Sequence, residues 1–397
     1  MFELKENPIL WPLSANSWSR EELAAAISTL LSERVTMGGR VREFETAFAR
    51  MHNRRWAVMV NSGSSANLIA TAAMFHMGKF QRGDEAIVPA VAWSTTYAPL
   101  HQYGLKLRVV DVNLKSLNVD VEKIEAAVTE KTRVLVGVSI LGNPAALHEM
   151  RQIATRHGLA FLEDNCESLG ASVEDTDFYN RLTGTFGDAS TFSFFFSHHI
   201  NTVEGGMILT DDDDLADTAI CLRAHGWTRD LRPNSPLRRF SPRNGFSMDY
   251  EFVLPGYNVR PTEISAALGL AQLGRLKEMN QQRINNTRDF IRAFMRDDRF
   301  VLQDLQRGAV PFGFTLICQS EEARELFVGR LAAAGIESRM ITGGNFALHL
   351  AEEHYEWQAV GELKNAELAH TRGFFLGNHP FPLTEQIAAA KAALGQP

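Results

Sequence analysis

The feature that most restricts the fold is a regular alternation of short apolar runs with longer helical segments. The first pair is WAVMV (56–60), which has strand character, followed by a helical segment over residues 64–77. Alternation of this kind predicts a mostly parallel sheet that is covered by helices on both faces. Further strands are expected over 84–90, 107–112, 133–139, 159–164, 190–196 and 206–210, and further helices over 94–104 and 147–158.

The two ends of the chain carry helix signals of their own. Ser19 and Glu22 have the spacing of a capping box, which predicts a helix that starts at Ser19. Residues 261–297 are typical of one long helix, or of two in succession, that bridges to a smaller lobe. We therefore expect a large domain over 1–260, a bridging helix over 261–300 and a small α/β domain over 301–397.

Charge and cysteine content exclude several classes of function. The net charge of −7 argues against a nucleic-acid partner. No apolar run is long enough for a bilayer, and the N-terminus has no signal core, so a cytoplasmic protein without membrane contact is expected. Cys166, Cys221 and Cys318 form no CxxC pair, which argues against a metal site, and three thiols cannot supply four ligands to an iron–sulfur cluster.

Polar residues follow several of the predicted strands, where ligands of parallel sheets bind. In NSGSSA (61–66), Gly63 permits close backbone approach, while Ser64 and Ser65 offer hydroxyl and amide groups at a helix N-terminus. This pattern indicates a phosphate site, although Ser-Gly-Ser is also common turn chemistry. Trp93 follows the next strand and either packs in the core or stacks on a planar ring.

An acidic residue and a histidine pair follow two later strands. Asp164 ends the strand over 159–164, where it either caps a helix or pairs with a pyridinium nitrogen. His198 and His199 are adjacent, so they are poorly placed to chelate one metal ion, and no metal-binding spacing surrounds them. A histidine in isolation is more often packed or exposed than catalytic. The surrounding sequence, GDASTFSFFFSHHINTVEGGM (187–207), favours a catalytic role here.

Together these segments resemble the DegT/DnrJ/EryC1/StrS sugar aminotransferases, a family of fold-type I pyridoxal phosphate (PLP) enzymes that act on nucleotide-linked keto sugars. The resemblance implies an aspartate aminotransferase-like α/β fold with a mostly parallel seven-stranded sheet and a smaller C-terminal α/β domain. It covers most of the chain. The segments that carry it are VREFETAFAR (41–50), NSGSSAN (61–67), the Trp93 turn, EDNCESLGA (163–171), residues 187–207, RAHGW (223–227) and GYNVRPTEISAALGLAQL (256–273).

The chain departs from the family pattern at one decisive position. The family carries its cofactor-linking lysine six residues before the Glu of Glu-Gly-Gly, and counting back from Glu204 gives His198. No lysine lies between Lys131 and Lys277, so no nearby residue replaces it. We therefore expect PLP and its amino form, pyridoxamine phosphate, to bind without covalent attachment.

A histidine at this position is similar to the 3-dehydratase branch of the family. The resemblance implies a hydro-lyase that removes the C3 hydroxyl of a nucleotide-linked 4-keto-6-deoxyhexose, with L-glutamate as amino donor and release of ammonia. GDP-4-keto-6-deoxy-D-mannose, on the colitose-type route to O-antigen dideoxysugars, is the expected substrate. A second branch acts on a CDP-linked sugar and needs an iron–sulfur cluster, which the cysteine count excludes.

Roles for individual residues follow from the same resemblance. His198 is expected to be the catalytic base, with the ordinary pKa of about 6.5 that suits a base near neutral pH. Asp164 would pair with the pyridine nitrogen, Glu167 would lie near the ring hydroxyl, and Trp93 would stack on the ring. The residues expected at the phosphate are Gly63, Ser64, Ser65 and Ser193, together with Asn258 of the other subunit in a homodimer with shared active sites. The further candidates for sugar or nucleotide contact are His225, Arg229, Arg339 and Asn345.

Two alternatives remain at this stage. One is a sugar aminotransferase that carries a Lys-to-His change, and the other is a non-catalytic protein that kept the PLP fold. The paired SHHI context argues against the first alternative. The presence of Asp164, Trp93 and the phosphate loop argues against the second.

Overall fold

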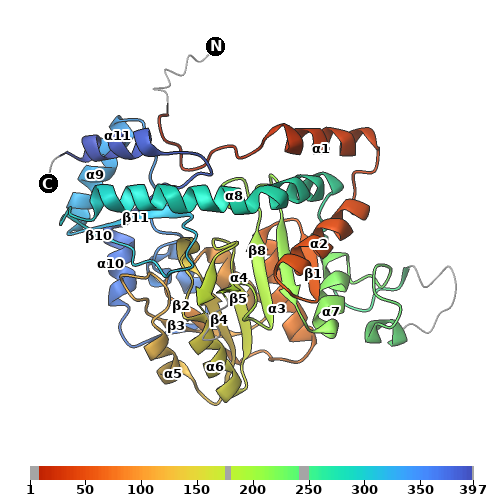
Figure 1. Cartoon of the computed structure of the whole chain (residues 1–397). Helices are drawn as coiled ribbons and strands as arrows, with labels where there is room; N and C mark the ends of the chain where they lie inside the picture. The colour runs from red at the N-terminus through yellow and green to blue at the C-terminus, as the bar shows by residue number, and fades with distance from the viewer. Residues whose placement is uncertain (1–8, 175–179, 241–249, 396–397) are drawn as a thin grey trace, which may run out of the picture.

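The computed structural model describes residues 9–174, 180–240 and 250–395, and its centre is one large twisted sheet (Figure 1). The strands of this sheet are β1 (Trp56–Val60), β2 (Glu85–Pro89), β3 (Lys106–Val110), β4 (Thr132–Val138), β5 (Ala160–Asp164), β8 (Ala189–Ser193), β9 (Gly206–Thr210) and β12 (Trp357–Val360). Their order is β1-β9-β8-β5-β4-β2-β3-β12, and only β9 runs against the others. The mostly parallel fold-type I sheet is confirmed. It has eight strands rather than seven, because β12 joins its edge beside β3.

Helices cover both faces of this sheet. The described helices are α1 (Arg20–Leu31), α2 (Gly39–Met51), α3 (Gly63–His76), α4 (Ser94–Gln102), α5 (Ile124–Ala127), α6 (Leu147–His157), α7 (Asp213–Arg223), α8 (Glu263–Phe294), α9 (Glu321–Ala333), α10 (Lys364–Arg372) and α11 (Thr384–Leu394). Successive strand residues point to opposite faces. Val58 and Val60 therefore pack with α3, α4 and α7, whereas Ala57 and Met59 pack with α2 and α8.

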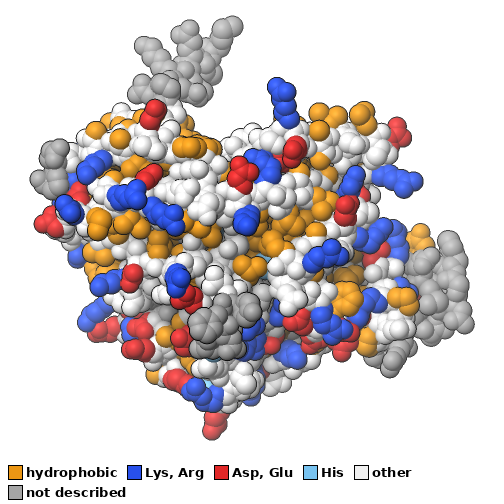
Figure 2. Space-filling view, viewed as in Figure 1, with side chains coloured by type: hydrophobic (Ala, Val, Ile, Leu, Met, Phe, Trp, Pro, Cys, Tyr) orange, Lys and Arg blue, Asp and Glu red, His pale blue; other side chains and the backbone are white. Residues whose placement is uncertain are grey.

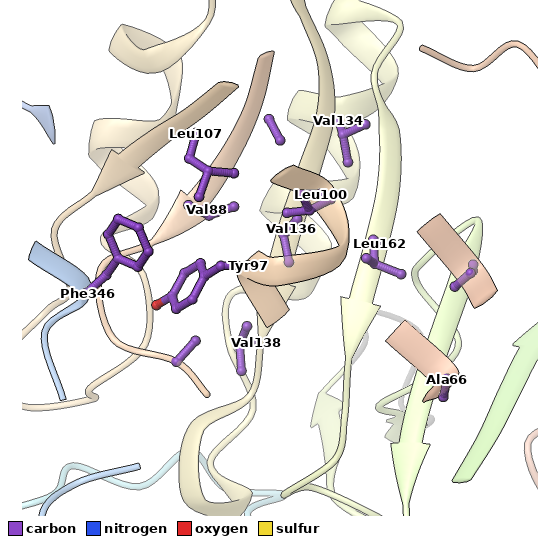
Figure 3. Packing of buried hydrophobic residues seen from close by; sticks show 14 of the residues in the cluster. Ala66, Val88, Tyr97, Leu100, Leu107, Val134, Val136, Val138, Leu162 and Phe346 are labelled. Atoms are coloured by element: carbon purple, nitrogen blue, oxygen red, sulfur yellow. The ribbon is translucent and has the colours of Figure 1, made fainter. Parts of the chain in front are cut away.

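The core on the α3 and α4 face ties the sheet to the strand-end loops (Figure 3). Tyr97 of α4 lies over Val88 and Val136, its ring 4.7 Å from that of Phe346, and its hydroxyl donates to the carbonyl oxygen of Pro89 at 2.9 Å. The hydroxyl of this buried tyrosine is thus satisfied by the last residue of β2. The start of α4, which carries Trp93, is fixed against the sheet as a result.

The C-terminal part of the chain forms a second, smaller layer. It contains the antiparallel sheet of β10 (Phe300–Leu302), β11 (Gly313–Cys318) and β13 (Gly373–Gly377), and a two-stranded ribbon of β6 (Ser172–Glu174) and β7 (Asn180–Leu182) lies elsewhere. The long helix α8 is continuous and runs along the top of the molecule toward this layer (Figure 1). The division into domains at 260 and 300 stays a prediction.

The predicted helix start at Ser19 is present as a full capping box with Glu22. No helix in the described ranges is long and apolar enough to cross a membrane. Residues 1–8, on which part of the signal-peptide prediction depends, lie outside these ranges.

Candidate active site

A cavity of about 270 Å³ lies beyond the carboxyl ends of the parallel strands. It collects residues from the start of α3, the start of α4, the turn after β5, the segment after β8 and the C-terminal layer. The predicted residues that line it are Gly63, Ser64, Trp93, Asp164, Glu167, Ser193, His198 and Arg339. No lysine is among the lining residues of the described chain. The strand-to-helix turns, which the sequence predicted to lie at one edge of the sheet, therefore meet around this cavity.

One end of the cavity is built for an anion. The Ser62 hydroxyl caps α3 by accepting the N–H of Ser65 at 3.1 Å, which leaves the first amides of the helix directed toward the cavity. A Cβ on Gly63 would lie 2.4 Å from the Cβ of Ser193, so only glycine allows these two segments to meet. A Cβ on Gly206 would lie 2.2 Å from the carbonyl oxygen of Ser62, which explains a glycine at the start of β9.

Asp164 is held as an acceptor at the centre of the cavity. It is buried, and its Oδ2 accepts hydrogen bonds from Asn67 Nδ2 at 2.9 Å and from Thr96 Oγ1 at 2.8 Å. Its Oδ1 accepts from the backbone N–H of Cys166 at 3.1 Å. No arginine or lysine of the described ranges forms an ion pair with it. A carboxylate fixed in this way can still accept a hydrogen bond from one cationic donor in the cavity. The protonated nitrogen of a pyridinium ring is such a donor.

Trp93 and Glu167 flank this carboxylate. Trp93 is 47% exposed and lines the cavity, and the guanidinium of Arg339 lies 5.1 Å from the centroid of its ring. A large aromatic face left open at a strand end is suited to stacking on a planar ring. Burial raises the pKa of Glu167 to about 7, although the N–H of Leu141 donates to its Oε2 at 2.8 Å and Arg339 opposes the rise. Glu167 therefore changes protonation near neutral pH.

His198 lies on the segment after β8, with its ring centroid 5.1 Å from that of Phe312 and 6.1 Å from that of Phe195. Its Nδ1 is buried and has no hydrogen-bond partner among the described residues, which leaves Nε2 as the nitrogen that we assign to the cavity that His198 lines. Burial first, and then the positive charges of Arg283 and Arg339, lower the pKa of His198 to about 3. The ordinary pKa of about 6.5 makes no allowance for this burial or for these charges, because the sequence does not show what surrounds the ring. His198 is neutral at pH 7.

Several predicted residues lie away from this cavity. Ser65 is held in the α3 cap by Ser62, and Asn345 caps the turn at Ala347 while its own N–H donates to His370. Asn258 and Arg229 line a different cleft of about 760 Å³. The expected roles of these residues in binding stay predictions.

His225 lines neither of the two cavities. Its backbone φ is 65°, and its N–H donates to the carbonyl oxygen of Tyr257 at 2.6 Å. The strained conformation is unusual for a residue other than glycine. Its expected contact with the substrate stays a prediction.

Other residues of the site carry no signal that sequence reasoning used. Asn67 and Thr96 hold Asp164, Thr342 contacts Glu167 at 3.4 Å, and Phe312 covers His198. Asn67 ends the NSGSSAN motif and Thr96 lies three residues after Trp93, so both could have been found as neighbours of named residues. Phe312 and Thr342 come from the distant C-terminal layer.

The polar groups that line the cavity suit both the phosphate and the ring nitrogen of pyridoxal phosphate. The α3 N-terminus and Ser193 suit the phosphate, Asp164 suits the ring nitrogen, and the Gly63 contact leaves the backbone close enough to bind. The fold and this site define a fold-type I PLP-type protein. The chain belongs to the DegT/DnrJ/EryC1/StrS aminotransferase family, whose model matches residues 16–394.

The comparisons place the chain near one activity within that family. It is 41% identical to GDP-4-keto-6-deoxy-D-mannose 3-dehydratase of Yersinia pseudotuberculosis, over 96% of each chain. The structure of the E. coli GDP-4-keto-6-deoxy-D-mannose-3-dehydratase with bound hydrated PLP is similar with a TM-score of 0.92 and 39% identity, covering 98% of this chain and 100% of that one. A crystal structure of GDP-4-keto-6-deoxymannose-3-dehydratase with a trapped PLP-glutamate geminal diamine matches with a TM-score of 0.91 and 39% identity, covering 97% and 100%.

Proposed function

We propose that the chain is a PLP-dependent lyase that removes the C3 hydroxyl of a nucleotide-linked 4-keto-6-deoxyhexose. The observation that carries this proposal is His198, which stands at the family's lysine position in a cavity lined by no lysine among the described residues. A family member without that lysine cannot hold the cofactor covalently. It needs another base, and the neutral His198 ring supplies one.

GDP-4-keto-6-deoxy-D-mannose and L-glutamate are the substrates we propose. The relatives at 41% identity carry this GDP-sugar in their names, and a solved relative holds glutamate joined to PLP. The products are the GDP-linked 4-keto-3,6-dideoxy sugar, 2-oxoglutarate and ammonia, because the oxygen lost from C3 balances the oxidation of glutamate. This chemistry belongs in the synthesis of dideoxysugars of the colitose type. The three cysteines are free, which agrees with a reducing cytoplasm as its proposed location.

Each residue of the cavity has a defined task in this reaction. When bound, the cofactor supplies an amino group for the sugar's C4 carbonyl and a ring that accepts electrons. The α3 N-terminus binds its phosphate, Trp93 covers one face of its ring, and Asp164 keeps a proton on its nitrogen. Asn67 and Thr96 orient the Asp164 carboxylate through their hydrogen bonds to Oδ2.

His198 moves the proton. Its Nε2 takes a proton from the cofactor carbon that bears the amino nitrogen, and the same nitrogen then protonates the C3 hydroxyl, which leaves as water with its bonding electron pair. The low pKa of His198 keeps the ring free to accept the first proton at neutral pH. It also makes the protonated ring a strong acid, which favours proton delivery to the poorly leaving hydroxyl.

A homodimer with shared active sites is part of the proposal. Asn258 and Arg229 line the cleft of about 760 Å³, where they do not reach the cavity of their own chain. We propose that Asn258 and Arg229 of one subunit complete the active-site cavity of a second copy of the chain. The α1 helix also presents an apolar stripe that nothing in the described chain covers, seen as orange side chains at the upper right of Figure 2. Its exposed members are Leu23, Ile27, Leu30 and Leu31.

The decisive experiment is a product assay with glutamate and a panel of nucleotide-linked 4-keto sugars. A 3-dehydratase releases ammonia and 2-oxoglutarate in equal amounts and yields a 3-deoxy sugar. An aminotransferase forms an amino sugar and releases no ammonia, which would refute the proposed reaction. A protein that binds no PLP at all would be the non-catalytic alternative. GDP-4-keto-6-deoxy-D-mannose is expected to be the best substrate of the panel.

A further inference from the structure

Arg283, near the middle of α8, is buried and has no counter-ion among the residues that the structure describes. Its side chain is 2% exposed, and no carboxylate of the described ranges forms an ion pair with it. Its guanidinium donates to two backbone carbonyl oxygens, those of Asn378 and of His198, the latter at 3.3 Å. Its Nε is buried with no hydrogen-bond partner in the described part of the chain. A buried charge is costly unless it is paired, so this arginine needs a reason to be where it is.

The ionisable groups around Arg283 are histidines rather than acids. His198, His199 and His379 each have a pKa lowered first by burial and then also by the charge of Arg283, to about 3, 3 and 4. His199 Nε2 lies 3.0 Å from the carbonyl oxygen of Val310, and His379 Nε2 lies 2.8 Å from that of Pro12. The one permanent cation of this cluster therefore faces three imidazoles that stay neutral.

Arg283 does not line the active-site cavity, so an anionic ligand there does not meet its guanidinium. It contacts His198 through the main chain, at the carbonyl oxygen of that residue. A lysine could not span the same contacts, because the planar guanidinium reaches two carbonyl oxygens at once. Arg283 thus donates a hydrogen bond to the main chain of His198 and also places an unneutralised positive charge close to that residue.

We propose that Arg283 is a positioning residue for the dehydration: it fixes the His198 main chain to α8 and places a buried positive charge close to the imidazole ring, where it adds to the effect of burial. This inference rests on the proposed function for its catalytic meaning. The effect of the Arg283 charge on the protonation of His198 does not depend on the proposed function. The protonated His198 ring is therefore a stronger acid than an ordinary imidazolium, and the C3 hydroxyl of the sugar is the group that receives its proton.

Other charges also face His198, and they define what Arg283 adds. Arg339 lies on the cavity side and acts in the same direction. Asp164, Glu167 and Glu204 line the same cavity and act in the opposite direction, as does a bound phosphate. The groups on the cavity side change with ligand and pH. Arg283 is sealed from them and supplies a constant field, which is why it is the residue to test.

The test compares Arg283→Gln, which removes the charge, with Arg283→Lys, which keeps it. Each PLP-loaded protein is labelled with 13C at histidine Cε1 and titrated by NMR from pH 8 to pH 4 without substrate, and the His198 signal is assigned with His198→Asn. Wild-type His198 is expected to stay neutral to the lower limit. In Arg283→Gln its midpoint should rise by roughly one to three pH units, the usual effect of a charge a few ångströms away. In Arg283→Lys, which keeps the charge, His198 should stay neutral to the lower limit as in the wild type.

Two results would overturn the inference. One is a wild-type His198 that titrates near its ordinary pKa, which needs no variant to observe. The other is a His198 signal that stays neutral down to pH 4 in folded Arg283→Gln just as it does in the wild type, which would leave Arg283 as a purely structural tie. If Arg283→Gln fails to fold, Arg283→Met, of similar length and without charge, takes its place.

The same variants separate this inference from the proposed function. The acid limb of the pH profile of kcat for sugar dehydration should move upward in Arg283→Gln and not in Arg283→Lys. If the product assay detected no dehydration while the His198 titration still moved, the control of His198 by Arg283 would stand and the proposed function would fall. If dehydration occurred without any change in titration, the reverse would hold.

Discussion

Replacing Gly63 with alanine tests whether the loop at the start of α3 is the cofactor's phosphate site. The new Cβ would lie 2.4 Å from the Cβ of Ser193, 2.9 Å from its Oγ and 3.0 Å from the Sγ of Cys166. Ser193 is the last residue of β8 and is buried, so its side chain cannot easily move away from the new Cβ. Either Ser193 or the first turn of α3 must shift, and both belong to the proposed phosphate site.

The size of the effect follows from the cost of such a clash. Forcing one extra carbon into a well-packed position costs about 1–3 kcal/mol. If that cost falls on the bound state, the affinity for PLP falls roughly 5- to 150-fold, since each 1.4 kcal/mol is tenfold. The assay is an equilibrium titration of the unloaded protein with PLP, followed by the cofactor's absorbance. The melting temperature of the unloaded protein is measured in parallel.

Gly274→Ala is the matched control. Gly274 lies inside α8, and a Cβ there would meet no atom within 4 Å. This change is expected to leave PLP affinity unaltered and to stabilise the helix by up to about 1 kcal/mol. A Gly63→Ala protein that folds and binds PLP within twofold of the wild type would refute the reasoning, because the strained atoms would then not be those that hold the phosphate.

Three further predictions concern the buried polar groups. Thr96→Val removes the 2.8 Å hydrogen bond to Asp164 and should weaken PLP binding about tenfold in the same titration, whereas unchanged affinity would show that Asp164 needs no such support. We expect the absorbance of bound PLP in the wild type to change near pH 7, because burial raises the pKa of Glu167 to about 7, and Glu167→Gln should abolish that change. Burial lowers the pKa of His52 to about 4 in the folded protein, so the unfolded chain binds the extra proton and stability falls as the pH drops from 6.5 toward 4. His52→Phe should reduce the slope of unfolding free energy against pH in urea melts by about 1.4 kcal/mol per pH unit, and an unchanged slope would contradict it.

Local patterns were enough to predict the centre of the fold. The strands from β1 to β9 of the large sheet, and the helices α3, α4 and α6, follow from apolar runs and their spacing, because strands buried on both faces must be apolar throughout. The edge strand β12 was not predicted. It has only four residues, includes the polar Gln358, and reaches β3 from far along the chain. Nothing local marks such a strand.

The candidate site was predictable as far as its residues end strands or begin helices. Asp164, Trp93 and Gly63 meet in one cavity because carboxyl ends of parallel strands share an edge. The contacts that hold or tune them were not predictable in the same way. Arg283 reaches His198 from 85 residues away, and burial together with that charge decides whether the imidazole is neutral. An ordinary pKa was the only value that the sequence could supply.

The surroundings of His198 also predict what a lysine would do in its place. Burial and the charges of Arg283 and Arg339 disfavour a second cation at this point, so the amine of His198→Lys should be largely neutral and able to react with PLP. We expect borohydride to fix PLP to this variant and not to the wild type or to His198→Asn, as judged by protein mass. The variant should lose dehydration, because a covalent attachment recaptures the cofactor and lets the amino group stay with the sugar. A His198→Lys protein with full 3-dehydratase activity would show that His198 is not the base, and a borohydride-stable adduct on the wild type would show that another lysine holds the cofactor.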